Sequence, residues 1–108
     1  MWRQIFGEFM GTFVFLSIIM SVTSNTNEFG LAAVYIGLGL ATSILFVSKI
    51  SDVCAFNPAV TLALALRHNI DWSEAIALIL TQLLAGVVAY LWWHSTLDTA
   101  PFLPLFRA

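Results

Sequence analysis

The sequence predicts an all-α integral membrane protein with three transmembrane helices and one re-entrant half-helix. Of its 108 residues, 60% are hydrophobic and 9% are charged, and the mean hydropathy is +0.93. Soluble domains carry about 25% charged residues, so this chain has too few to cover a water-facing surface. Three apolar runs are long enough to cross a hydrocarbon core of about 30 Å, and a fourth run is half as long. We expect a single domain over residues 1–108.

The first predicted span covers about residues 2–22 and ends at the polar stretch TSNTNEFG. Glu8 lies about two helical turns into this span. It argues against a cleaved signal peptide, whose apolar core is uninterrupted. A carboxylate at membrane depth costs a few kcal/mol unless it is paired, hydrogen-bonded or hydrated. Glu8 either reaches the interface along its own side chain or accepts hydrogen bonds from an irregular backbone segment buried beside it.

The second predicted span covers about residues 30–47, the third covers 75–93, and a tail follows at 94–108. Helices are favoured because lipid offers no partners to unpaired backbone groups, and the segments lack the alternation of barrel strands. Gln82 lies near the middle of the third span, either as polar glue between helices or with a wider role. Small residues four apart could allow close helix packing in each span: Gly7 and Gly11, Gly37 and Ala41, Ala85 and Ala89.

The half-length run is PAVTLALAL, residues 58–66, and it follows the segment SDVCAF and Asn57. Asn57 is a good helix N-cap and Pro58 suits the first helical position. The helix would be about 14 Å long, half the hydrocarbon thickness. It has no charged face for lying flat on a membrane surface. We therefore expect it to point its positive N-terminal end and the Asn57 amide at the bilayer midplane, an arrangement that suits a dipolar solute and opposes cations.

Several classes of function are disfavoured. The net charge is −2, which leaves no basic patch for nucleic acid. Cys54 is the only cysteine, and His68 and His94 do not have the spacing of metal ligands, so we predict no metal and no cofactor. Glu8 and Cys54 have no plausible histidine partner within the membrane, so we do not expect an enzyme.

The basic residues bear on orientation in the membrane. Arg3, Lys49 and Arg67 would share one side, with Arg107 on the other. This bias favours a cytoplasmic N-terminus. Because it rests on four charges, insertion in both orientations stays open.

Four segments resemble the aquaporin and glycerol-facilitator family, in its N-terminal half, over residues 2 to about 92. WRQIFGEFMGT resembles the first helix of that half, IGLGLAT the second, FNPAVTLALAL the first Asn-Pro-Ala half-helix, and ALILTQLLAGVVA the third helix with its glutamine. The resemblance implies that Glu8, supported by Gln82, holds the re-entrant loop. It implies that Asn57 donates its amide to the permeating molecule. Pro58 and Ala59 would complete the contact between two half-helix tips.

The resemblance also implies a passive channel for water or small neutral solutes such as glycerol. Family members have two such halves in inverted orientation, with the pore between them. This sequence contains one. We therefore expect two oppositely inserted copies to form the pore as an antiparallel homodimer, and the resemblance suggests four pores per assembly. The alternative is a non-conducting structural or regulatory subunit that pairs with a full-length channel.

Three positions bear on selectivity. Val60 follows the Asn-Pro-Ala motif, where the second half of family members usually has arginine. The resemblance places about Ile36 at a filter position of the second helix that is usually aromatic in the family, with Tyr35 or Gly37 as neighbouring alternatives. Cys54, three residues before the motif, either lines the pore or is a small buried hydrophobe. We expect a less polar filter than in a strict water channel.

Overall fold

A computed structural model describes residues 1–97, with side chains through Ser95. The described part contains α1 (Trp2–Asn25), α2 (Phe29–Val47), α3 (Pro58–Leu66), α4 (Trp72–Trp92) and the π-helical turn η1 (Trp93–Leu97). Within residues 1–97, three segments are long and apolar enough to cross a membrane: α1, α2 and the stretch Trp72–Ser95. The predicted fold class, three membrane-length helices plus a half-helix, is confirmed.

Several helix ends differ from the predicted boundaries. The fourth helix, α4, begins at Trp72, three residues before the predicted start of the third span at residue 75. The first helix runs three residues past the expected end, to Asn25, whose Nδ2 donates to the Ser21 carbonyl at 2.6 Å. The predicted tail begins with helical structure, because η1 follows α4 directly. Within it, the Ser95 hydroxyl donates to the Leu91 carbonyl at 2.8 Å. The rest of that predicted tail, residues 98–108, lies outside the described residues.

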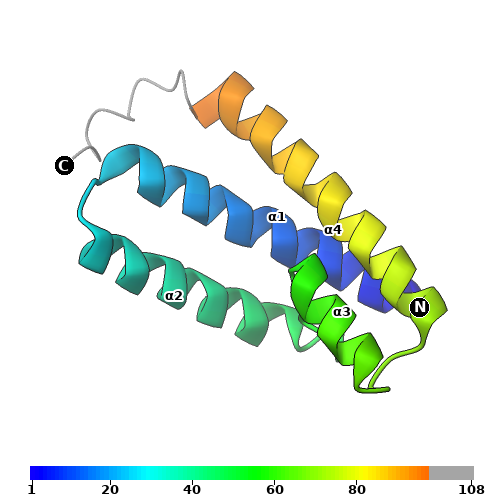
Figure 1. The fold of residues 1–108 in the computed structure, drawn as a ribbon. Coiled ribbons are helices and arrows are strands. Elements are labelled where there is room, and N and C mark those ends of the chain that lie inside the picture. Colours follow the sequence, from blue (N-terminus) through cyan, green and yellow to red (C-terminus); the bar gives the residue numbers. More distant parts are fainter. Residues whose placement is uncertain (98–108) are drawn as a thin grey trace.

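The helices are arranged so that α1 packs against both α2 and α4, while α3 packs against α4 (Figure 1). The start of α1, the end of α2, the end of α3 and the start of α4 lie toward one end of the bundle (Figure 1). From that end, α3 points its N-terminal tip back toward the middle of the bundle. The segment between α2 and α4 therefore begins and ends at the same end of the bundle, as a re-entrant segment does.

The turn after α3 reverses the chain within a few residues. His68 adopts a left-handed conformation with φ of 63°, and its N–H donates to the Ala65 carbonyl at 3.0 Å. The N–H of Asn69 donates to the Leu64 carbonyl at 2.9 Å. These paired bonds form a Schellman motif, which satisfies carbonyls left open at a helix end. The motif ends α3 after nine residues, a length of about 14 Å, which is half the thickness of the hydrocarbon core. The chain then continues into α4.

Gly7 and Gly11 of α1 lie against the segment that precedes the half-helix. A Cβ atom at Gly7 would lie 2.8 Å from the Ser51 Cβ, and one at Gly11 would lie 2.7 Å from the Phe56 Cδ1. Carbon atoms in contact normally lie about 3.5–4.0 Å apart, so neither position has room for a side chain. Gly11 therefore admits the re-entrant segment, whereas Gly7 admits both that segment and the end of α2, where Cγ1 of Val47 would lie 3.0 Å from the added Cβ atom.

In α2 the small residues that pack closely are not the predicted pair. Gly37 and Ala41 are exposed, and a Cβ atom at Gly37 would meet nothing within 4 Å. Gly39 is buried instead, where a Cβ atom would lie 2.8 Å from Cγ2 of Ile18 on α1. Within one chain, the close packing in α2 is therefore at Gly39 and not at the predicted pair, because spacing alone does not say which helix face meets a neighbour. In α4 the predicted small pair is fully buried: Ala85 and Ala89.

Candidate functional site

The N-terminal tip of α3 presents the Asn57 side chain. Asn57 has extended backbone angles and caps the helix through its Oδ1, which accepts the Ala59 N–H at 2.7 Å. Pro58 occupies the first helical turn, where its missing N–H costs nothing. Because Oδ1 is engaged in the cap, the Nδ2 group is left to donate elsewhere. Asn57 is exposed, and its Nδ2 has no hydrogen-bond partner within residues 1–97.

The loop before this tip is held by a buried carboxylate. Glu8 is completely buried in α1. Its Oε1 accepts the Ala55 N–H at 2.7 Å and its Oε2 accepts the Phe56 N–H at 2.8 Å. These two backbone donors lie outside any helix, and lipid cannot satisfy them. Glu8 therefore supplies the acceptors that a non-helical segment needs at this depth.

A chain of side-chain hydrogen bonds continues from Glu8 to the tip of α3. Gln82 of α4 donates from Nε2 to the Glu8 Oε2 at 3.2 Å and to the Thr61 Oγ1 at 2.7 Å. The Thr61 hydroxyl donates in turn to the Asn57 main-chain carbonyl at 3.0 Å. Glu8, Gln82 and Thr61 are each at most 2% exposed. Sequence analysis missed Thr61, although it is the only polar side chain in PAVTLALAL.

The same loop contains two strained residues. Cys54 has φ of 49° and Phe56 has φ of 55°, a conformation that costs a side-chain-bearing residue about 1–2 kcal/mol. The Phe56 ring is 3% exposed and lies against Gly11. The Glu8 bonds and this ring contact hold the backbone in its strained form. Sequence analysis did not single out Phe56, since left-handed backbone is not signalled by an aromatic residue.

The proposed selectivity residues fall into two places. Val60 is on α3, close after the tip, and is 44% exposed. Cys54 is half-buried in the loop, with its thiol 3.6 Å from the Ser51 carbonyl. Ile36 is half-buried in the first half of α2, about 16 Å along the helix axis from the end of α2 at Val47. The structure therefore brings Val60 and Cys54 near the tip and places Ile36 on a separate element.

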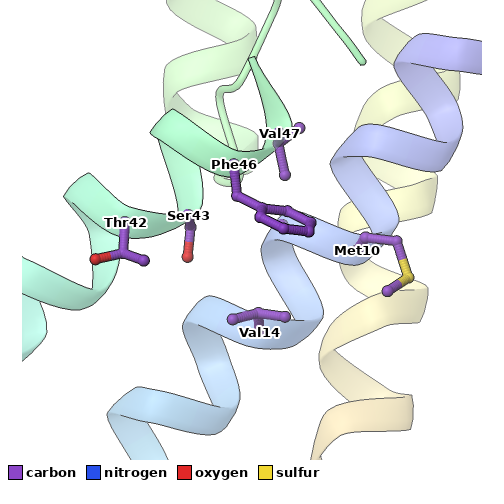
Figure 2. Close-up of a pocket in the computed structure, with 7 residues that line it drawn as sticks. Met10, Val14, Thr42, Ser43, Phe46 and Val47 are labelled. Carbon is purple, nitrogen blue, oxygen red and sulfur yellow. The ribbon is translucent and has the colours of Figure 1, made fainter. Parts of the chain in front are cut away.

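A groove of about 230 Å³ lies between α1 and α2. It is lined by Met10, Gly11, Val14, Thr42, Ser43, Phe46 and Val47. Figure 2 shows the Phe46 ring extending from α2 toward α1, near Met10 and Val14. The exposed lining is almost entirely apolar. This groove therefore offers water few hydrogen-bond partners, and it is not a polar path for a solute through one chain.

Burial of the Cys54 side chain, together with the nearby Glu8 and Asp52 carboxylates, raises the pKa of the Cys54 thiol. Only the thiolate reacts readily with iodoacetamide. We therefore expect the alkylation rate of Cys54 to reach its half-maximum at higher pH in the folded protein than in the chain unfolded in detergent. Mass spectrometry of samples quenched across a pH series measures both curves.

Substitution of the charged neighbour provides the control for this prediction. Asp52→Asn removes one of the negative charges and should move the midpoint of the folded curve to lower pH. Glu28→Gln changes a carboxylate that caps α2, outside the re-entrant loop, and should leave the midpoint unchanged. A folded midpoint at or below that of the unfolded chain would contradict the buried placement of Cys54.

Three membrane-length helices and a half-helix, whose capped tip follows a loop held by a buried carboxylate, define a half-repeat membrane fold. The chain belongs to the major intrinsic protein family, because a model of that family matches residues 1–102. Among residues 1–97, no three His, Cys, Asp or Glu side chains form a group that could hold a metal ion.

Similar proteins are bacterial glycerol facilitators by name. Glycerol uptake facilitator protein 3 of Lactiplantibacillus plantarum is 28% identical over 119 aligned positions, which cover 95% of this chain and 50% of the relative. The Glycerol uptake facilitator protein of Streptococcus pneumoniae serotype 4 is 29% identical, covering 76% of this chain and 38% of the relative. Glycerol uptake facilitator protein-like 6 of L. plantarum is 34% identical, with 81% and 40% covered. The chain thus spans half or less of these relatives, and no solved structure gives a significant match.

Proposed function

We propose that this chain forms one half of a passive membrane channel for water or small neutral solutes such as glycerol. The observation that carries the proposal is the exposed Asn57 amide at the tip of a half-helix, held in place by the buried Glu8. The family membership and the glycerol facilitators among its relatives support the same class of transport. They also agree with the prediction that the protein is not an enzyme.

The half-helix tip has the electrostatic character that neutral permeation needs. Helix N-termini carry a partial positive charge, equivalent to about half an elementary charge. This field disfavours cations near the tip, whereas a water molecule or an alcohol can accept a hydrogen bond from the Asn57 amide. Asn57 would thus be the solute contact, with Glu8 and Gln82 supporting the loop from behind.

The second half of the proposed pore is an inverted copy of this chain. The α3 tip leaves the polar side chain of Asn57 exposed, and exposed polar groups at membrane depth need a protein or aqueous neighbour. Inverted repeats meet at the bilayer midplane in many transport proteins. In such a dimer Pro58 and Ala59 of the two copies would complete the contact between tips, and four of these pores would form the assembly.

The same arrangement assigns the pore lining. The Val60 side chains of the two copies would face the pore from opposite sides. The region after the Asn-Pro-Ala motif would then have no charged side chain. Cys54 would line the passage beside the tip, and Ile36 would contribute from α2. A filter of these residues is less polar than one containing arginine, so glycerol should pass as well as water.

The charge distribution favours a second candidate, a non-conducting structural or regulatory subunit that pairs with a full-length channel. Arg3 is in the first turn of α1, and Lys49 and Arg67 come just after α2 and α3. These three helix ends lie toward the same end of the bundle (Figure 1). Cytoplasmic loops are enriched in Lys and Arg, so this end should face the cytoplasm. The bias opposes inverted insertion of a second copy. Topology is therefore the property that separates the two candidates.

Stopped-flow light scattering on proteoliposomes of this chain alone tests conduction. Water and then glycerol gradients should both give faster volume changes than in empty liposomes. Asn57→Ser keeps a good N-cap for α3 but removes the amide donors. We expect it to lower both permeabilities severalfold while the protein stays folded, because the solute contact is lost.

Two results would count against this channel. Folded protein with no flux above empty liposomes would leave the subunit as the better proposal. Labelling of single cysteines introduced at the chain ends in the native membrane provides the second test, in a background where Cys54 is replaced by serine. If the N-terminus reacts from one side only, the antiparallel homodimer is excluded.

A further inference from the structure

The buried hydroxyl of Thr61 lies between the supports of the loop and the tip of the half-helix. It receives the Gln82 amide at 2.7 Å and donates to the Asn57 carbonyl at 3.0 Å. We infer that Thr61 is a positioning residue, which sets the orientation in which Asn57 presents its amide to the solute. This inference rests on the proposed channel function and adds to it a residue that acts through Asn57.

The directions of these hydrogen bonds follow from the groups involved. The Gln82 Nε2 is only a donor, so the Thr61 oxygen must accept from it. The Thr61 hydroxyl proton is then left for the Asn57 carbonyl, its other neighbour. That carbonyl also accepts the Thr61 backbone N–H at 3.0 Å. Two donors from one residue thus converge on the Asn57 carbonyl.

Convergence on one carbonyl restricts rotation of the backbone at Asn57. The hydrogen bond from the Thr61 backbone N–H belongs to the first turn of α3, and it would survive loss of the hydroxyl. The hydroxyl bond adds a tether to Gln82, and through Gln82 to the Glu8 carboxylate that holds the loop. Thr61 therefore couples the tip of α3 to the loop support on α1 and α4. Loss of this tether should alter how the tip presents its donors rather than whether α3 forms.

Thr12 of α1 is a matched control within the same chain. It is 2% exposed and Thr61 is 0% exposed, so both threonines are buried between helices. The Thr12 hydroxyl has no hydrogen-bond partner in the described part of the chain, whereas the Thr61 hydroxyl has two. Replacing either threonine by valine removes one hydroxyl at nearly constant volume. Only the Thr61 change removes a tether to Asn57.

The test compares Thr61→Val, Thr61→Ser and Thr12→Val in proteoliposomes, using water and glycerol as the permeants. We measure the ratio of the two permeabilities and the temperature dependence of each. These quantities describe a single pore and do not depend on how many channels fold. Thr61→Val should change the ratio about fivefold, the factor that corresponds to one hydrogen bond, and should steepen the temperature dependence. Thr61→Ser and Thr12→Val should match the wild type.

A purely structural role predicts a different pattern. Thr61→Val would then lower both permeabilities in proportion, with an unchanged ratio and temperature dependence, and this result would overturn the inference. An equal effect of Thr12→Val would overturn it as well. If the valine variant does not fold, Thr61→Cys, which has a similar volume and only a weak donor, should also change the permeability ratio relative to the wild type.

A second measurement separates this inference from the proposed channel. If wild-type liposomes show no flux, the channel proposal fails, and the positioning of Asn57 is then read by NMR of the asparagine side-chain amides in lipid nanodiscs. Thr61→Val should shift the Asn57 amide resonances and Thr12→Val should not. Unshifted Asn57 resonances in folded Thr61→Val would overturn the inference whether or not the protein conducts.

Discussion

Replacing Glu8 with alanine is expected to lower the free energy of unfolding by about 2–6 kcal/mol, because two buried backbone donors lose their acceptor at about 1–3 kcal/mol each. These donors are the N–H groups of Ala55 and Phe56, now 2.7 and 2.8 Å from the carboxylate oxygens. Water cannot easily replace the carboxylate at this depth. Glu8→Gln should have an intermediate effect, since its amide offers one acceptor oxygen where the carboxylate offers two.

Glu28 provides a matched control for Glu8. It also accepts two backbone N–H groups, from Gly30 at 2.9 Å and from Leu31 at 2.6 Å, but at an exposed helix start. Glu28→Ala should cost about 0.5–2 kcal/mol, as for other N-caps, because water can reach the freed donors. Reversible unfolding in mixed detergent micelles, followed by circular dichroism, measures all three variants. Equal costs at the two glutamates would show that burial of Glu8 does not matter.

The loss of Glu8 should also be visible locally. With one acceptor oxygen fewer, the strained backbone at Cys54 and Phe56 is held less firmly. We expect Glu8→Gln to speed alkylation of Cys54 under conditions in which the helices stay folded. Permeability should fall in the same variant, because the loop no longer fixes the tip of α3. These two readouts distinguish a displaced loop from global unfolding.

The half-helix was predictable from sequence because several local rules agree on it. An Asn N-cap, a Pro in the first turn and a nine-residue apolar run define its start and length, and the structure has it at Pro58–Leu66. The need for a buried acceptor also followed from the sequence. Glu8 in a membrane span needs hydrogen-bond donors, and the irregular segment SDVCAF needs an acceptor for its backbone N–H groups. Those arguments need no knowledge of which residues touch.

The remainder of the site depends on contacts that spacing does not encode. Thr61 looked like one hydroxyl in an apolar run, and its place between Gln82 and Asn57 depends on how α3 rotates against α4. The choice of Gly39 over Gly37 depends on which face of α2 meets α1. Both are decided by rotation about a helix axis, and an apolar membrane helix has no polar face to reveal that rotation in its sequence.

Replacing Gly11 with alanine is expected to displace the loop at a cost of about 1–3 kcal/mol, the range for overpacking a buried site. The added Cβ atom would overlap the Phe56 ring, lying 2.7 Å from its Cδ1. The ring has little freedom to move away, because Phe56 is 3% exposed and its N–H is bound by Glu8. We expect lower permeability as well, since Phe56 directly precedes Asn57. Micelle unfolding and liposome flux measure the two effects.

Gly37→Ala is the control, because a Cβ atom there meets nothing within 4 Å. Alanine has a higher helix propensity than glycine by about 1 kcal/mol, so this change should leave stability equal or higher. A double-mutant cycle then assigns the Gly11 effect to its cause. Phe56→Ala alone should be destabilising through the cavity that it leaves, yet Gly11→Ala should cost little in that background because the clashing ring is gone. Strictly additive costs would mean that Gly11 and Phe56 do not touch, and the close approach of the loop to α1 would have to be abandoned.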